Sequence, residues 1–294
     1  MAKSREIIKR RKSVANIRKI TKTMEMIATA KFKKVHDCAI GAKPYTQTIG
    51  KLVSTLAGDR NQIAHPLLEE NPDTSRVLLL VLTSNRGLCG GYNGNILRLA
   101  TEQLDQLQRE EHETELRVSG KKGISYFKFS GIETDAAYTN FDDKTAYADV
   151  EPLANEFIKL YTDRQIGSIR IVYTKFISAA RHQPEVLTLL PLGDLHPTSP
   201  YEEEIPFSQP DYLFSPSAEE ILDQLIPTTV RAILFQCFLD AIVSEQIARM
   251  RAMKGATDNA QKMIEALTRQ YNRARQTQIT GELLDIVGGA EALK

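Results

Sequence analysis

The 294-residue sequence lacks most features that mark membrane-spanning, secreted or metal-binding proteins. Its longest unbroken apolar run, Val77–Leu82, is far shorter than the roughly 20 residues of a bilayer-crossing helix, and no apolar signal segment opens the chain. It has only three cysteines, Cys38, Cys89 and Cys237, which are widely separated and form no CxxC pair. These absences predict a soluble protein of a reducing compartment, without a disulfide framework or a zinc site.

Residues that could form a catalytic constellation are missing as well. The five histidines are scattered, and none pairs with another metal ligand at helical spacing. Neighbouring carboxylates lie in polar stretches, without the apolar surroundings that typically make a carboxylate catalytic. We therefore expect no catalytic residue, no metal and no cofactor in this chain.

The net charge of +1 conceals an uneven distribution. Residues 1–35 contain twelve lysines and arginines against two glutamates, whereas residues 36–244 have a net charge of −11. A basic end predicts contact with an acidic partner, and a nucleic-acid-binding coiled coil is one possibility. That possibility is disfavoured because Phe32 is the only aromatic residue of the basic segment, too few for base stacking.

Residues 1–58 favour one very long helix. Their narrow apolar stripe recurs at roughly heptad spacing and leaves two choices open. Its positions are Ile7, Val14, Ile17, Ile20 or Thr21, Met24, Ile27 or Ala28, and Val35. A helix of about 50 residues would reach about 75 Å, which no small domain could cover, so it needs a partner helix.

Residues 217–294 predict that partner. Their second half has small or apolar residues at alternating three- and four-residue steps, the spacing of a left-handed coiled-coil seam. These positions are Ala256, Ala260, Met263, Leu267, Tyr271, Ala274 and Gln278. The two terminal helices are thus expected to form an antiparallel pair.

Residues 75–193 have the alternating strands and helices of an α/β domain with a mainly parallel sheet. We expect a buried strand at 77–82, a Lys-Lys-Gly turn at 121–123, and a hairpin of strands 169–176 and 185–190. The proline-rich residues 194–216 are expected to be a tether rather than a structural element.

A glycine-rich loop, residues 83–94, follows the first strand of this domain. It could bind an anion and make the domain a nucleotide-binding enzyme, or it could be a tight crossover into the next helix. The spacing matches neither GxGxxG nor GxxxxGK[ST], and no lysine is placed to hold a phosphate. The crossover is therefore favoured, with Cys89 as a structural residue.

Several segments of the chain together resemble the gamma subunit family of F-type ATP synthases. They are Ser13–Met26, Ser84–Asn93, Ser244–Ala260, Tyr271–Thr280 and Glu282–Gly289. The resemblance implies an antiparallel left-handed coiled coil of the two terminal helices with an inserted Rossmann-like α/β domain. It also implies a non-catalytic central shaft, which couples ion-driven rotation to ATP synthesis or hydrolysis at sites in other subunits.

The resemblance further implies the partners and the location of the chain. The coiled coil would stand in a hexameric ring of α and β subunits, and the α/β domain would join the ε subunit and the c-ring. Neither nucleic acid nor direct membrane insertion is expected. Because the family motif begins close to Met1, without room for a transit peptide, we expect a peripheral protein on the cytoplasmic face of a bacterial inner membrane.

The resemblance also assigns contacts with the α/β ring. On the first helix they are Met24 and the basic face of Lys19, Lys22 and Lys31, which suits an acidic lobe of the β subunits. On the last helix they are Arg275, Gln276, Thr280 and Glu282. The family's photosynthetic branch has a redox switch of two closely spaced cysteines, and this chain has no such pair.

Overall fold

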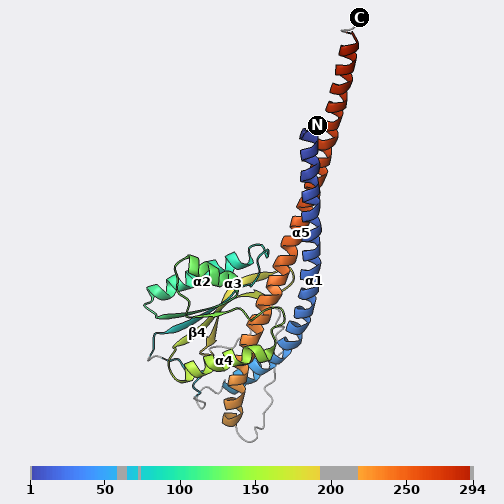
Figure 1. Ribbon diagram of the computed structural model, residues 1–294. Helices are drawn as coiled ribbons and strands as arrows, with labels where there is room; N and C mark the ends of the chain where they lie inside the picture. Colours follow the sequence, from blue (N-terminus) through green and yellow to red (C-terminus); the bar gives the residue numbers. More distant parts are fainter. Residues whose placement is uncertain (1, 58–64, 72–73, 193–217, 292–294) are drawn as a thin grey trace. The chain divides into compact units, whose positions relative to one another are not determined.

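The computed structural model describes residues 2–57, 65–71, 74–192 and 218–291. In chain order its elements are α1 (Ala2–Ala57), β1 (Val77–Leu82), α2 (Tyr92–Arg109), β2 (Thr114–Ser119), α3 (Lys121–Phe129), β3 (Ala136–Tyr138), α4 (Tyr147–Thr162), β4 (Ser168–Phe176), β5 (His182–Leu190) and α5 (Ala218–Glu291) (Figure 1). The predicted fold class, two long terminal helices around an inserted α/β sheet, is confirmed. The predicted tether at 194–216 lies outside the described residues.

The chain divides into two compact units. Residues 31–248 form the first, which contains the sheet, and residues 1–30 with 249–294 form the second, which contains only helix. Helices α1 and α5 contribute to both units. We call them the sheet unit and the helical unit and describe each by itself.

The sheet unit contains one five-stranded sheet in the order β3-β2-β1-β4-β5. The first four strands are parallel, and β5 returns antiparallel to β4 as the expected hairpin. Every residue of the central strand β1 is buried, which explains its uninterrupted apolar sequence. The order matches the first five positions of the Rossmann order 3-2-1-4-5-6, with the last of these strands reversed.

Two hydrophobic cores lie on opposite faces of this sheet. On one face, Leu78 and Leu80 pack with residues of α4 and α5. On the other, Leu79 and Val81 pack with residues of α2 and α3. Because side chains alternate along a strand, β1 contributes to both cores and holds the layers together. Figure 1 shows α2 and α3 on one side of the sheet and α4 on the other.

The prediction of a Lys-Lys-Gly turn at 121–123 is wrong, because these residues begin helix α3. The turn lies one residue earlier, at Gly120, whose φ of 101° suits glycine and whose backbone is packed against Thr83. The same close packing continues at Gly123, where Thr83 Oγ1 accepts the backbone N–H at 2.9 Å. The glycines thus let α3 start tightly against the end of β1.

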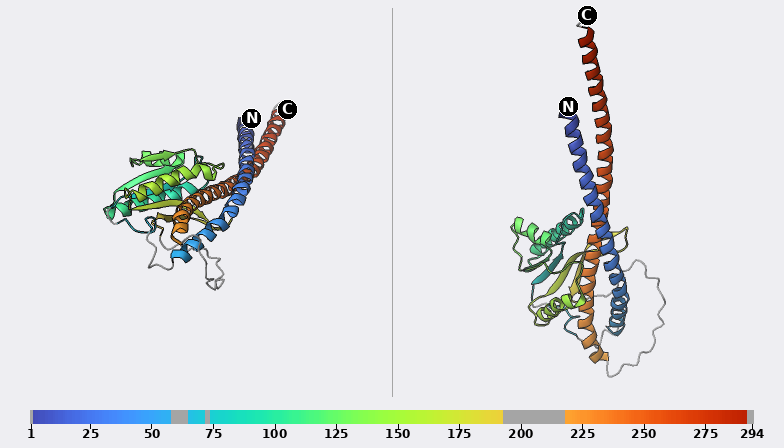
Figure 2. Two further views of the ribbon diagram at one scale, coloured as in Figure 1. Left: turned by 90° about the horizontal axis from the view of Figure 1, so that it is seen from below. Right: turned by 45° about the vertical axis from the view of Figure 1, so that its right-hand side comes forward.

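In the helical unit, α1 and α5 run antiparallel, with the start of α1 and the end of α5 at the same end of the pair (Figure 2). Helix α1 buries Val14, Thr21 and Ala28, which are spaced by seven residues. Thr21 meets α5 directly, since Thr257 Oγ1 lies 2.9 Å from Thr21 Oγ1. Of the two choices that the sequence left open, the seam therefore contains the smaller residue each time.

The α5 side of the seam is narrower than predicted. Ala260 and Leu267 are buried as expected. Met263, predicted to lie in the seam, is 45% exposed, and Ile264 packs beside Val14 instead. Met263 and Ile264 lie three and four residues after Ala260, so they lie on opposite edges of the apolar stripe of α5 and only one of them needs to face the seam.

Among the described residues, α5 is the one helix that is long and apolar enough in composition to cross a membrane. Polar residues such as Gln236 and Asp240 interrupt its apolar positions, so no long unbroken run marks it in the sequence. However, 61% of its most apolar window is buried inside the protein. Leu222, Val230 and Leu234 belong to the core of the sheet unit, and this burial accounts for the composition.

Candidate partner-contact surface

Most of the predicted ring-contact residues lie exposed on the helical unit. Lys19, Arg275, Gln276 and Thr280 are exposed side chains on α1 and α5. Their exposure leaves their charges and amides free to meet another subunit.

Two further predicted residues of this unit have a polar partner on their own helix. Lys22 Nζ lies 3.1 Å from Glu25 Oε1, one turn along α1, and Glu282 Oε1 accepts a hydrogen bond of 2.8 Å from Gln278 Nε2. Met24 is half-buried. Such exposed pairs within one helix are weak and exchange readily for a partner on another protein.

Lys31 differs from the other predicted residues. It belongs to the sheet unit, where its Nζ lies 2.8 Å from Asp143 Oδ1 in the segment between β3 and α4. Burial by itself would raise the pKa of Asp143, but the Lys31 ammonium outweighs it and the pKa lies below the usual value. The Lys31 charge is thus directed to a partner inside this chain.

Sequence reasoning missed an apolar component of the helical surface. Ile17, Ile20 and Ile27, assigned to the seam or left as alternatives, are 52%, 59% and 51% exposed. Near the end of α5 the exposed large apolar side chains are Ile279, Leu283, Leu284, Ile286 and Val287. Apolar residues lined up on a helix without a covering element indicate a surface that another protein covers.

Among the residues that the structure describes, the last turns of α5 have no helix beside them in this unit. Arg11 of α1 lies over the ring of Tyr271, 5.7 Å from its centroid. Nine residues of α1 precede Arg11, whereas twenty residues of α5 follow Tyr271, so about eleven residues of α5 extend beyond the start of α1. Figures 1 and 2 show this single-helix end, which contains most of the exposed apolar residues of α5.

The glycine-rich loop, in the sheet unit, is closed by its own polar groups. Asn93 Oδ1 accepts the backbone N–H of Ser84 at 3.0 Å, and Asn93 Nδ2 donates to Cys89 Sγ at 3.2 Å. Cys89 is buried beneath them. Gly90 takes a φ of 59°, a conformation suited to glycine in a tight turn. The geometry agrees with a structural crossover.

Helix α5 packs at the end of the sheet where Rossmann-like folds bind ligands. That place is outside the carboxyl ends of the strands where the strand order reverses, here β1 and β4. Tyr92 Oη, at the start of α2, donates to the Ala241 carbonyl at 3.0 Å, and Ser244 Oγ donates to the Thr174 carbonyl at 3.3 Å. A helix therefore takes the position that a nucleotide has in enzymes of this topology.

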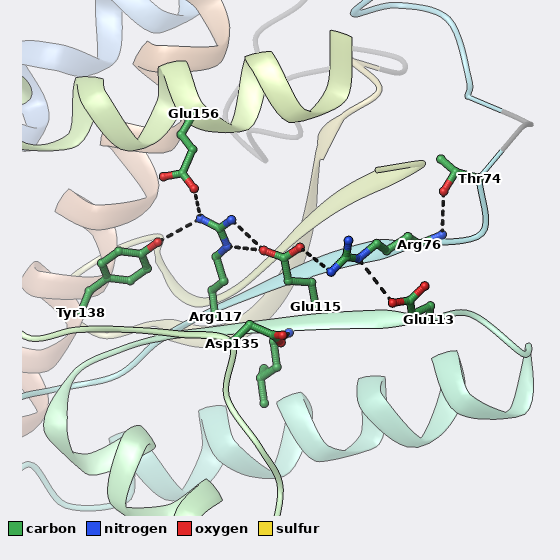
Figure 3. Close-up of polar contacts among 9 residues, drawn as sticks. Thr74, Arg76, Glu113, Glu115, Arg117, Asp135, Tyr138 and Glu156 are labelled. Carbon is green, nitrogen blue, oxygen red and sulfur yellow. Dashed lines mark hydrogen bonds and ion pairs between the residues drawn. The ribbon is translucent and has the colours of Figure 1, made fainter. Parts of the chain in front are cut away.

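A buried ionic network lies on the β2–β3 side of the sheet and was not predicted (Figure 3). Arg117 of β2, only 7% exposed, donates to Glu115 Oε1 at 2.7 Å and to Glu156 Oε1 of α4 at 2.6 Å. It also donates to Tyr138 Oη of β3 at 3.0 Å. One guanidinium thus ties three elements together, as its fork of donors allows.

The network continues toward the start of β1. Arg76 lies 3.2 Å from Glu115 and 3.7 Å from Glu113. Burial alone would lower the pKa of Arg117, but the hydrogen bonds that it donates to Glu156 and Glu115 raise the pKa overall. Because each of these charges has an opposite partner, the arrangement is structural. The Glu-Leu-Arg alternation of β2, which puts two charges on one face of an internal strand, was the available signal.

Comparison with known proteins identifies the family. A family model described as ATP synthase matches residues 3–293. The sequence is 48% identical to the ATP synthase gamma chain of Rhodopirellula baltica over 295 residues, which cover 100% of both chains. The chain belongs to the ATP synthase gamma chain family. The chain is also 42% identical to the ATP synthase gamma chain of Leptospira biflexa over 293 residues, and this match covers 100% of both chains.

Solved structures agree with the fold of a gamma chain. A chain in mitochondrial ATP synthase from Euglena gracilis superposes with a TM-score of 0.65 at 18% identity, over 99% of this chain and 95% of that one. A chain in the central stalk and c-ring structure from Tetrahymena thermophila gives 0.54 at 19% identity, over 81% and 99%. At these identities the likeness concerns the fold alone.

Membership of the gamma chain family decides between the functional classes that the sequence left open. The gamma chain is the non-catalytic central-stalk subunit of ATP synthase. The interpretation as a shaft is therefore confirmed over a nucleotide-binding enzyme and a nucleic-acid-binding coiled coil. Among the described residues no three His, Cys, Asp or Glu side chains gather as a metal site.

Proposed function

We propose that this gamma-family chain rotates within a ring of α and β subunits and couples ion flow through a c-ring to ATP synthesis, or ATP hydrolysis to ion pumping. The observation that carries the proposal is that the two helices of the helical unit are unequal. The basic α1 starts beside α5 about eleven residues short of the end of the longer α5. A shaft can bias identical neighbouring subunits differently only if it presents different surfaces to them. This helix pair supplies such an asymmetry in both length and charge.

On α1, the contacts with the ring are Lys19, Lys22 and Met24. The exposed lysines suit an acidic lobe of a β subunit, because contacts between exposed charges are screened by solvent and re-form easily at a new orientation. Exposed Ile20 and Ile27 add apolar area to the same helix. Lys31 was predicted to join this set and has Asp143 as its partner within the chain.

On α5, the contacts are Arg275, Gln276, Thr280 and Glu282. Arg275, Gln276 and Thr280 lie beside the first turns of α1, and Glu282 lies just beyond the start of α1, where α5 continues as a single helix. Their side chains are exposed. Of the four, Glu282 accepts a hydrogen bond from a side chain of its own helix, that of Gln278. These polar side chains offer the screened, adjustable contact that a rotating element needs.

The remaining partners are proposed from the family and from its solved relatives. One relative's structure contains F1 and the c-ring, and another the central stalk with the c-ring. We assign the α/β domain to the ε subunit and the c-ring, and the chain to the membrane surface through these proteins rather than through lipid. In a bacterium this surface is the cytoplasmic face of the inner membrane.

The first test is assembly with α and β subunits. These are co-expressed with and without this chain, separated by size-exclusion chromatography and assayed for sustained ATP hydrolysis. The proposal expects the chain to elute with an αβ hexamer and to raise its activity. A chain that elutes alone and leaves the hexamer's activity unchanged would overturn the proposal.

The second test addresses the α5 contacts. Replacing Arg275 and Gln276 with alanine is expected to lower the ATPase activity of the assembled complex about tenfold, the size of a typical interface hot spot. Arg273→Ala is the matched control, because it is equally exposed on the same helix but was not assigned to the contact. Equal losses in both variants would contradict the assignment.

A further inference from the structure

The segment from residue 139 to Tyr147, the first residue of α4, contacts three other parts of the sheet unit. We call it the clasp loop. Its first contact is with the glycine-rich loop, since Asn85 Nδ2 donates to the carbonyls of Thr139 at 3.1 Å and Phe141 at 3.0 Å. Asn85 Oδ1 in turn accepts the backbone N–H of Lys121. One amide side chain thereby fixes the base of the clasp loop to the end of β1 and the start of α3.

Two aromatic contacts join the clasp loop to α5. The ring of Phe141 lies 4.5 Å from that of Phe238, measured between centroids, and Phe141 is buried. Tyr147 meets Phe235 edge-on at 5.6 Å. Phe235 and Phe238 are three residues apart, so they lie on one face of α5 and both ends of the clasp loop rest on it. The loop is thus attached to the C-terminal helix as well as to the sheet.

The tip of the clasp loop holds α1. Asp142 Oδ1 accepts the backbone N–H of Lys144 at 2.8 Å, and Thr145 Oγ1 accepts that of Asp142 at 2.8 Å, so the turn is rigid. This turn presents Asp143 to Lys31, whose ammonium lies 2.8 Å away. Both side chains are partly buried, 32% and 23% exposed, which strengthens the pair relative to a fully solvated one.

Within the sheet unit, the other contacts of the described α1 side chains with α5 and the sheet are mainly apolar or aromatic. Val35 and Ala39 pack with Leu239 and Ile242 of α5, and the ring of His36 meets Phe176 at the end of β4, 5.5 Å between centroids. Apolar contact is non-directional and resists sliding or rotation of a helix only weakly. The charged contact is directional, because it joins one atom of α1 to one atom of a rigid turn.

We propose that Lys31 and Asp143 lock α1 to the α/β domain, so that both long helices turn together with it, and that Lys31 is a positioning residue for rotary coupling. This inference rests on the proposed shaft function. Torque delivered to the α/β domain reaches α5 through Phe141 and Tyr147 and reaches α1 through Asp143, all in one loop. Loss of the charged contact lets α1 lag behind α5 under load.

The test uses the complete ATP synthase in inverted membrane vesicles. The variants are Lys31→Gln, Asp143→Asn, the two together, and the charge reversal Lys31→Asp with Asp143→Lys. The readout is the membrane potential generated per ATP hydrolysed, followed with a voltage-sensitive dye, which works for either coupling ion. Lys175→Gln is the matched control, because it breaks a similarly buried ion pair of 3.1 Å with Glu185 inside the β4–β5 hairpin.

Each single variant is expected to lower the potential per ATP about threefold, the change that a partly exposed ion pair supports. The double variant should be no worse than either single one, the charge reversal should restore coupling, and Lys175→Gln should leave it intact. The inference is overturned if Asp143→Asn has no effect, whether or not Lys31→Gln has one, because Lys31 would then act without Asp143. Failure of the shaft function itself would give a different result. The unmutated chain would then not assemble with the other subunits, or vesicles that contain it would generate no membrane potential.

Discussion

The two units of this chain treat apolar residues in opposite ways. In the sheet unit, all six residues of β1 are buried between two cores, and helices cover both faces of the sheet. In the helical unit, α1 buries one residue per seven and leaves Ile17, Ile20 and Ile27 exposed. The sheet unit is therefore stabilised by its own core, whereas the helical unit leaves apolar side chains exposed.

The largest expected effect of a single substitution falls in the sheet unit. Arg117→Ala should reduce the free energy of unfolding by about 3 kcal/mol, because it removes the nearer of the two guanidinium partners of the buried Glu115 and leaves Arg76 alone beside that carboxylate. Urea unfolding followed by tyrosine fluorescence measures this, and exposed Arg98→Ala is the control. A loss no greater than that of the control would show that the network adds no stability.

A smaller effect is expected at the seam of the helical unit. Ala28→Leu should destabilise the helix pair by about 1–3 kcal/mol, because Ala28 is 1% exposed and the seam has no room for a larger side chain. The control is Ile27→Leu, because the neighbouring Ile27 is half exposed. Thermal melting followed by circular dichroism compares them, and equal melting curves would contradict the seam as described.

Exposed apolar residues of the same helix should show the reverse pattern. Replacing Ile20 and Ile27 with serine is expected to change the free energy of unfolding by no more than about 0.5 kcal/mol per site. The affinity for an α/β ring should nevertheless fall about tenfold, since contact area is lost only in the complex. The affinity is measured as binding of the chain to surface-immobilised αβ hexamer. An unchanged affinity would mean that the ring does not cover these residues.

The smallest effect concerns pH and the buried His65 of the sheet unit. Its Nδ1 accepts the backbone N–H of Leu67 at 3.1 Å, and burial lowers its pKa although Asp223 and Glu69 act in the opposite direction. The unfolded chain therefore takes up this proton near pH 6.5, before the folded chain does, and stability should fall as the pH drops below that value. Urea midpoints at pH 7.5 and 5.5 measure the slope. His65→Asn should flatten it, and an identical slope in both proteins would exclude this histidine.

Much of the fold could be predicted because its signals are local. The apolar run of β1 and the hairpin of β4 and β5 lie where they were expected. Helix α5 continues through Pro227 and its internal glycines because its buried positions repeat on both sides of them. Helix α3 was missed, since its nine residues begin with Lys-Lys-Gly, which is typical of a turn and forms a helix only against Thr83.

The predicted contact residues illustrate the same limit. The family motifs located Arg275, Gln276, Thr280 and Glu282, and the structure places all four on the surface of the helical unit. Lys31 has the same basic context as Lys19 and Lys22, yet it pairs with Asp143, 112 residues away. No local pattern contains such a pair, because it depends on where the loop after β3 comes to lie.

By itself, the sequence determined the long terminal helices, the inserted sheet and the family, because heptad spacing, strand alternation and family motifs are properties of neighbouring residues. Only the tertiary structure decided that Thr21 and Ala28, rather than Ile20 and Ile27, face α5. Adjacent positions on a helix differ by about 100° in direction, and a seam between closely packed helices accepts the smaller side chain. The larger one turns outward and becomes part of the exposed surface.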